Sequence, residues 1–160
     1  MITPKKTSLA EVLHQTKPFA GVEQEAYLSI LRTASQLSHS ADVFLKGHGV
    51  TQPQYNVLRI LRGAGSEGLC RNQIAERLVT AVPDVSRLLD RMEDAGWIRR
   101  ERGQQDRRQV STTITEAGLK LLKTLDAPVN RMHGAQFKGM AAEQLQQLLE
   151  ILTEVRSRTG

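Results

Sequence analysis

The sequence has little cysteine and few aromatic residues. A single cysteine, Cys70, occurs among 160 residues, so one chain can form neither an internal disulfide nor a zinc site built on several cysteines. This cysteine usage is typical of a protein that works in the reducing cytoplasm. Only three Phe, two Tyr and one Trp are present, while Leu, Ile, Val and Ala recur three and four positions apart. This pattern predicts a mainly helical fold.

Long apolar runs and catalytic motifs are also missing. No stretch reaches the roughly 18 consecutive apolar residues of a membrane span, and the first 21 residues lack the apolar segment of a signal peptide. We therefore expect a soluble, cytoplasmic protein. The sequence contains no glycine-rich phosphate loop and no nucleophile motif, and no metal spacing relates its four histidines, which are His14, His39, His48 and His133. We expect no enzyme activity, no catalytic residue, no metal and no cofactor.

The net charge is modestly basic. The 22 Lys and Arg exceed the 17 Asp and Glu, which gives a formal charge of +5 and a pI near 9.7. Such an excess favours polyanionic partners such as nucleic acid, although a solvated basic surface explains it equally well. The length suits one domain with its own hydrophobic core.

Apolar periodicity predicts six helices after an N-terminal arm. Residues 1–21 contain Pro4 and Pro18 and show no sustained period, which indicates an arm that is either disordered or packed on a partner subunit. The helices are predicted at residues 23–46, 51–62, 71–78, 83–95, 115–132 and 141–156.

Several start signals support these helices. Thr51 is predicted to cap the second helix, with Pro53 in its first turn, and Pro83 is predicted in the first turn of the fourth. Thr115 is the predicted cap of the fifth helix, and Pro128 is a candidate kink within it. The short third helix is too short to be stable alone, and we expect it to bury Ile74, Ala75 and Leu78.

The third and fourth helices have the spacing of a helix-turn-helix, in which the second helix lies in the DNA major groove and the first braces it. Four polar side chains of this second helix fall outside its apolar set, namely Asp84, Ser86, Arg87 and Arg91. An arginine can bind a guanine edge or a phosphate, and a serine can contact either. The alternative is that these are ordinary solvent-facing residues.

A β-hairpin is predicted from residues 98–102 and 109–114, which flank a turn at 103–106. Residues 98–108 contain five arginines against Glu101 and Asp106, an excess of three positive charges. An arginine-tipped hairpin beside a groove-reading helix can enter the minor groove, whose negative potential attracts guanidinium groups. The alternative is a winged helix that contacts proteins, but such a module would not need five arginines.

Five stretches resemble the multiple-antibiotic-resistance regulator (MarR) family, and the resemblance runs from about Glu23 to the C-terminus. The stretches are Asn72–Leu78, Val85–Glu93, Gly96–Arg100, Asp106–Arg108 and Ile114–Gly118. The resemblance implies a mainly α fold with a small β-hairpin wing. Residues 22–160 would form one domain, in which 51–115 are the winged helix-turn-helix and 22–50 and 116–160 are dimerisation helices.

The resemblance also implies a function. Members of the family are sequence-specific transcription regulators, by default repressors, and the wing arginine, here Arg107, enters the minor groove beside Arg108. Asp106 would hold that arginine through a charge-assisted hydrogen bond, although a local turn role is also open for it. The apolar stripes of the first and last helices exceed what one small domain can cover, which indicates a homodimer. Its two recognition helices would then read an inverted repeat with half-sites about 34 Å apart.

Family members commonly bind small, often anionic aromatic effectors. His39, Asp42, His48 and Arg59 are polar candidates for such a site, although exposed or structural roles suit each of them better. Cys70 precedes the short bracing helix, where we expect a small buried hydrophobe rather than a redox sensor.

The start of the recognition helix departs from the family pattern. Residues 81–84 (AVPD) stand where many members carry small hydroxyl residues, so the base preference there is open. Asp84 suits a helix start, and its alternative role is to accept a hydrogen bond from a cytosine amine.

Overall fold

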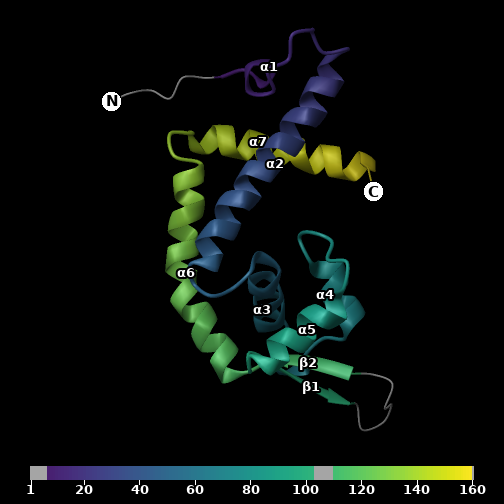
Figure 1. The fold of residues 1–160 in the computed structure, drawn as a ribbon, viewed down its shortest axis with the longest axis vertical. Helices are drawn as coiled ribbons and strands as arrows, with labels where there is room; N and C mark the ends of the chain where they lie inside the picture. The colour runs from purple at the N-terminus through teal and green to yellow at the C-terminus, as the bar shows by residue number, and fades with distance from the viewer. Residues whose placement is uncertain (1–6, 103–109, 160) are drawn as a thin grey trace. The chain divides into compact units, whose positions relative to one another are not determined.

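The computed structural model describes residues 7–102 and 110–159 (Figure 1). The chain divides into two compact units, residues 1–52 and 53–160. The mainly helical fold with one antiparallel hairpin that the sequence predicts is confirmed. In the described ranges, no helix is long and apolar enough to cross a membrane.

The first unit contains helices α1 (Leu9–Val12) and α2 (Val22–Lys46). The α1 turn lies inside the segment for which the sequence predicts no regular structure. A capping box explains it, because the Ser8 N–H donates to Glu11 Oε2 (2.7 Å) and the Glu11 N–H donates to Ser8 Oγ (3.3 Å). The α2 helix agrees with its prediction within one residue at its start.

The second unit holds the other elements in the predicted order. They are α3 (Gln52–Ala64), a 3₁₀ turn (Gly65–Glu67), α4 (Arg71–Arg77), α5 (Val85–Asp94), β1 (Ile98–Arg102), β2 (Val110–Ile114), α6 (Glu116–Gln136) and α7 (Ala142–Thr159). The α3 helix continues past Gly63, and α6 continues through Pro128. The prediction that Pro83 lies in the first turn of α5 is wrong. Asp84 is the N-cap of that helix, so Pro83 precedes it.

One apolar core joins α3, α4, α5, β1 and α6. Its fully or nearly fully buried side chains include Val57, Leu58, Leu61, Ile74, Leu89, Met92, Ile98 and Leu122. The prediction that Ala75 is buried is wrong, since that residue is exposed. The α4 helix has only seven residues, and Ile74 is its one buried side chain. Leu78, which follows the helix as its C-cap, is partly buried against the same core.

The hairpin has a regular register in which Ile98 pairs with Ile114 and Arg102 with Val110. On its other side, β2 pairs with Leu69, because Leu69 and Thr112 exchange two backbone hydrogen bonds of 3.0 and 2.9 Å. Gly68 permits this close approach. Its φ is +67°, and a Cβ there would lie 2.7 Å from the Thr112 carbonyl oxygen. The sequence does not predict this third strand position.

The junction between β2 and α6 is held by Thr115. Its hydroxyl donates to the Gly96 carbonyl (2.7 Å) and accepts from the Gly118 N–H (3.2 Å), as the predicted cap should. Its own N–H donates to the Trp97 carbonyl (3.0 Å). One residue therefore starts α6 and also fastens it to the loop between α5 and β1.

Candidate nucleic-acid interface

The α5 helix is strongly two-sided. Leu88, Leu89 and Met92 are buried in the core, whereas Arg87 and Arg91 are exposed and Ser86 is half-buried. The α5 helix packs against α4 and β1. These contacts hold the helix in place, and its polar side chains extend from it toward solvent. Figure 1 shows α4, α5 and the hairpin side by side next to α3. The side chains predicted from the sequence therefore share one outward side of α5.

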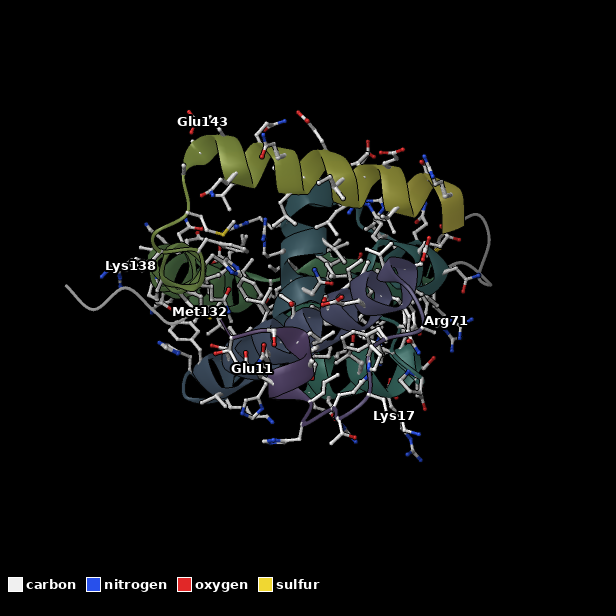
Figure 2. All side chains as sticks on the ribbon, turned by 90° about the horizontal axis from the view of Figure 1, so that it is seen from above. Glu11, Lys17, Arg71, Met132, Lys138 and Glu143 are labelled. Carbon is white, nitrogen blue, oxygen red and sulfur yellow. The ribbon has the colours of Figure 1, made fainter. Side chains whose placement is uncertain are left out.

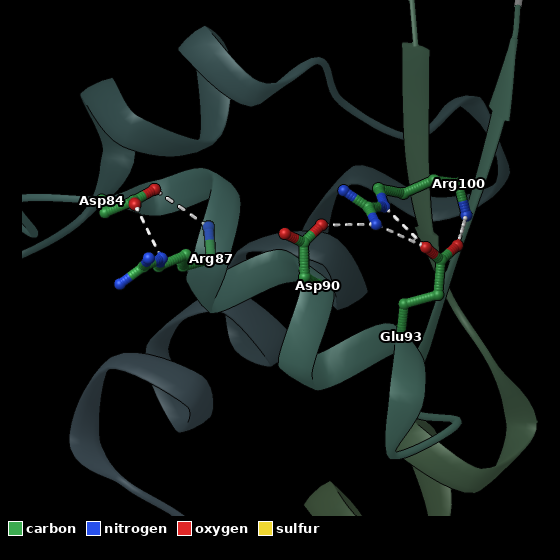
Figure 3. Close-up of polar contacts among 5 residues, drawn as sticks. All are labelled: Asp84, Arg87, Asp90, Glu93 and Arg100. Atoms are coloured by element: carbon green, nitrogen blue, oxygen red, sulfur yellow. Dashed lines mark hydrogen bonds and ion pairs between the residues drawn. The ribbon is translucent and has the colours of Figure 1, made fainter.

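Asp84 begins α5 and contacts one of these arginines. Its Oδ1 accepts a hydrogen bond from the Arg87 N–H (2.9 Å), and its Oδ2 lies 3.6 Å from Arg87 Nε (Figure 3). The structure therefore shows the helix-cap role that the sequence analysis weighs for Asp84. The Arg87 side chain stays 78% exposed, so the contact leaves it accessible. Arg91 forms no ion pair with any residue that the structure describes.

The arginines of β1 differ in their surroundings. Arg99 pairs with Glu101 on its own strand (Nη2 to Oε1, 2.7 Å). Arg100 pairs with two carboxylates of α5, whereas Arg102 has no ion-pair partner within residues 7–102 and 110–159. From the sequence alone, all the hairpin arginines are expected to contribute to one positive patch. The fold neutralises part of that charge internally, so the count overstates the charge available to a ligand.

The Arg100 contacts link the hairpin to α5 (Figure 3). Its Nη2 lies 2.7 Å from Asp90 Oδ1 and 2.6 Å from Glu93 Oε2. Its Nε and backbone N–H donate to the two Glu93 oxygens at 2.8 and 2.9 Å. Hydrogen bonds from the Arg100 side chain hold the pKa of Glu93 below its ordinary range, so this carboxylate is charged at neutral pH.

This three-residue contact is not among the features predicted from the sequence, although the sequence contains a signal for it. Asp90 and Glu93 are three residues apart and so lie on one side of a helix. Arg100 is two residues after Ile98, so both point to the same face of the hairpin. Since Ile98 is a core residue, Arg100 has to face toward the body of the domain.

A cleft of about 430 Å³ lies between α4, α5 and the hairpin, and Cys70, Arg71, Ser86 and Arg100 contribute to its lining. Cys70 is the N-cap of α4, and its N–H donates to Gln73 Oε1 (2.9 Å). The residue is partly exposed. The expectation of a small buried hydrophobe at this position is therefore wrong, because a helix-capping position faces the surface here.

Three of the effector candidates belong to the first unit and one to the second. His39 is exposed on α2, Asp42 pairs with Lys46 (3.0 Å), and a ring nitrogen of His48 lies 2.9 Å from the Phe44 carbonyl oxygen. Arg59 belongs to the second unit, and its guanidinium lies 6.0 Å from the centroid of the Tyr55 ring. An effector role stays a prediction for each of these residues.

Three predicted DNA contacts, Asp106, Arg107 and Arg108, lie outside the described residues and stay predictions. Among residues 7–102 and 110–159, no group of three His, Cys, Asp or Glu side chains is arranged to hold a metal ion.

The chain is similar to known regulators over most of its length. The MarR family model matches residues 50–110. The HTH-type transcriptional regulator TtmR of Methylorubrum extorquens (strain PA1) is 30% identical over 135 residues, which cover 84% of this chain and 67% of TtmR. A MarR transcription factor from Planctomyces limnophilus is 38% identical, with a TM-score of 0.66, over 85% of this chain and 98% of that one.

A third comparison is with a protein bound to DNA. The S. aureus MepR–DNA complex matches with a TM-score of 0.74 and 28% identity, over 82% of this chain and 97% of the MepR chain. The winged helix fold, the motif positions and these similarities agree with one another, and the chain belongs to the MarR family of winged helix transcription regulators.

Proposed function

We propose that this protein is a ligand-responsive repressor that binds a palindromic DNA operator as a homodimer. The observation that carries the proposal is the outward side of α5, where Ser86, Arg87 and Arg91 extend from a helix whose opposite side is buried. A helix anchored in this way can place its first turns in a major groove without rearranging.

The side chains on α5 suit the two kinds of contact that DNA binding needs. Arg91 has the geometry for a bidentate bond to guanine or for a phosphate contact, and Ser86 can donate or accept at a base edge. The S. aureus MepR structure, which is a DNA complex, supports a DNA partner for this chain as well. By resemblance, Arg107 and Arg108 of the wing would add minor-groove and phosphate contacts, with Asp106 holding Arg107.

A homodimer is supported by apolar side chains that one chain leaves exposed. On α2, Tyr27 is 62% exposed, and on α7, Ile151 is 59% and Leu149 is 58% exposed. None of the described side chains of α7 is buried, while polar groups such as Glu143 point away from its first turn (Figure 2). A second copy that covers these apolar stripes accounts for them. The segments 22–50 and 116–160 are therefore the proposed dimerisation helices.

The regulatory part of the proposal is an aromatic or anionic effector that lowers the affinity for DNA. It is supported by the family resemblance, with His39, Asp42 and Arg59 as candidate contacts. A DNA partner also implies that the protein acts in the cytoplasm of a bacterial cell. Release of a bound operator by simple aromatic carboxylates, followed by fluorescence anisotropy, tests the effector separately from DNA binding.

The DNA-binding proposal is tested by selecting binding sites from a random duplex pool with the purified protein. We expect an inverted repeat that binds tightly, with an affinity that falls steeply between about 50 and 200 mM salt because phosphate contacts release counterions. Arg91→Ala should weaken binding by about tenfold or more, in line with ~1–3 kcal/mol for one base-reading arginine.

The matched control is Lys17→Ala, which removes one exposed positive charge between α1 and α2, outside the helix-turn-helix and the proposed dimerisation segments. This variant should bind like the wild type. If no sequence is enriched and the affinity for random duplex is independent of salt, DNA regulation is excluded and a protein-binding winged helix is the better assignment.

A further inference from the structure

The proposed recognition helix is α5, and the described part of the wing consists of the paired strands β1 and β2. One arginine joins α5 to β1. Arg100 contacts Asp90 in the middle of α5 and Glu93 in its last turn, through three side-chain contacts of 2.6 to 2.8 Å and one backbone hydrogen bond of 2.9 Å (Figure 3). A planar guanidinium that binds two carboxylates is fixed in direction as well as in distance. These contacts therefore restrict how β1 can move relative to α5.

The position of Arg100 in the hairpin makes this restriction effective. The base of β1 is anchored by Ile98, which is buried in the core, and Arg100 lies two pairs further out, opposite the buried Thr112. Its side chain is 27% exposed. Among the described residues, Arg100 is the outermost residue of β1 for which a hydrogen bond or an ion pair to α5 is seen. The direction in which the wing leaves the domain therefore depends on it.

The charges around Arg100 differ from those around the exposed arginines that are proposed to bind DNA. Its single positive charge lies between two carboxylates, so the three groups together carry one negative charge. Bound in this way, the guanidinium directs Nε and Nη2 at the carboxylates rather than at a phosphate, and it partly screens the two negative charges. The cluster cannot increase affinity by attracting DNA, so any benefit to binding has to come from geometry.

We propose that Arg100 is a positioning residue for DNA binding, which holds the wing against the recognition helix so that both enter their grooves in one fixed relative orientation. This inference rests on the proposed DNA-binding function. A reader with two groove-contacting elements loses affinity when the second element has to be oriented during binding, because that ordering opposes association. Specific binding depends on this orientation more than nonspecific phosphate binding does.

The sharpest test neutralises the two carboxylates, because positioning and simple electrostatics predict opposite results. The double variant Asp90→Asn with Glu93→Gln keeps hydrogen-bond acceptors at both sites but removes two negative charges beside the DNA-binding side. Electrostatics alone predicts tighter binding to any DNA. Positioning predicts that affinity for the selected operator falls by about tenfold, or ~1.4 kcal/mol, while affinity for a random duplex is unchanged or rises.

Two substitutions of Arg100 and one control variant complete the design. Arg100→Gln should lower the operator-to-random affinity ratio to a similar extent as the double variant, and Arg100→Lys should restore only part of it, since an ammonium cannot bind both carboxylates in a planar fork. Asp94→Asn is the matched control. It removes one exposed charge from the same helix, at a residue that forms no ion pair with the described residues, and it should not lower the ratio.

Urea unfolding at a fixed protein concentration identifies any variant with a reduced folded fraction, and affinities are compared for folded protein only. The inference is overturned if the double variant binds the operator as tightly as the wild type or more tightly. It is also overturned if only Arg100→Gln weakens binding, which would make Arg100 a direct DNA contact. Failure of the proposed function looks different, because the wild type itself would then not distinguish operator from random duplex.

Discussion

The Arg62 guanidinium and the Asp126 carboxylate form a two-point ion pair that joins α3 to α6. Nη1 lies 2.8 Å from Oδ2 and Nη2 lies 3.0 Å from Oδ1, which is the parallel geometry that makes arginine–carboxylate pairs directional. Arg62 lies in the last turn of α3, next to the buried Leu61, and Asp126 follows the buried Leu125 of α6. The pair therefore borders the core on its solvent side.

This ion pair should make a measurable but small contribution to stability. Both side chains are more than a third exposed, so solvent screens the pair, and we expect Asp126→Asn to lower the free energy of unfolding by about 0.5–1 kcal/mol. A double-mutant cycle with Arg62→Gln, measured by urea unfolding at equal protein concentrations, isolates the coupling. Additive effects of the two substitutions would show that the pair contributes nothing.

Acid should weaken the fold through the same carboxylates. Hydrogen bonds from Arg62 and Arg100 lower the pKa values of Asp126 and Glu93 below their ordinary ranges. A carboxylate with a lowered folded-state pKa stabilises the protein above its unfolded pKa, and this contribution is lost as the pH falls through the folded pKa. The loss should therefore begin near pH 4.3 for Glu93 and near pH 3.9 for Asp126, the approximate unfolded values, and continue below them.

Thermal unfolding between pH 6 and pH 3 measures this effect. The double variant Glu93→Gln with Asp126→Asn lacks both titrating groups, so its melting temperature should fall less over this range than that of the wild type. Equal slopes in the two proteins would contradict the assignment of acid sensitivity to these two pairs.

Much of this fold follows from local sequence signals. The Thr115 cap and the apolar spacing of α3 and α5 are short-range features, and each has the predicted structural role. The outward side of α5 was also predictable, because burial of Leu88, Leu89 and Met92 leaves Arg87 and Arg91 on the other side.

The features that the sequence did not reveal depend on contacts between distant segments. The partners of Arg100 and the pairing of Leu69 with Thr112 are set by how β1 and β2 pack in the domain. Local spacing indicates only that Arg100 faces the body of the domain and that Asp90 and Glu93 share one side of α5, and it does not bring these segments together. The local pattern predicts the start of α5 only to within one residue. Pro83 and Asp84 both suit a helix start, and only the backbone conformation decides that Asp84 is the N-cap and Pro83 precedes it.

Asp84 offers a way to separate helix capping from base recognition. Asparagine caps a helix about as well as aspartate, so Asp84→Asn should leave stability nearly unchanged, whereas Asp84→Ala should cost about 1 kcal/mol. If Asp84 acts only as a cap, Asp84→Asn should also bind DNA several-fold more tightly on every sequence, since it removes a negative charge near the phosphates. Site selection with this variant checks the alternative, because a contact to a cytosine amine would appear as a changed base preference at one position.

Two glycines of α6 should respond in opposite directions to the same substitution. A Cβ at Gly118 would lie 2.3 Å from the Trp97 carbonyl oxygen, whereas a Cβ at Gly134 would meet no atom within 4 Å. The Trp97 carbonyl also accepts the Thr115 N–H, so it cannot move away without loosening the junction between β2 and α6. Gly118→Ala should therefore destabilise the protein by about 2–3 kcal/mol, and Gly134→Ala should stabilise it by about 0.5–1 kcal/mol, because alanine favours the helix.

Urea unfolding of both variants beside the wild type, at one protein concentration, tests this prediction, and the sign of each change is the result that matters. Similar small effects at the two positions would mean that α6 can shift away from Trp97. The close contact at Gly118 would then not explain why glycine follows the Thr115 cap at this spacing.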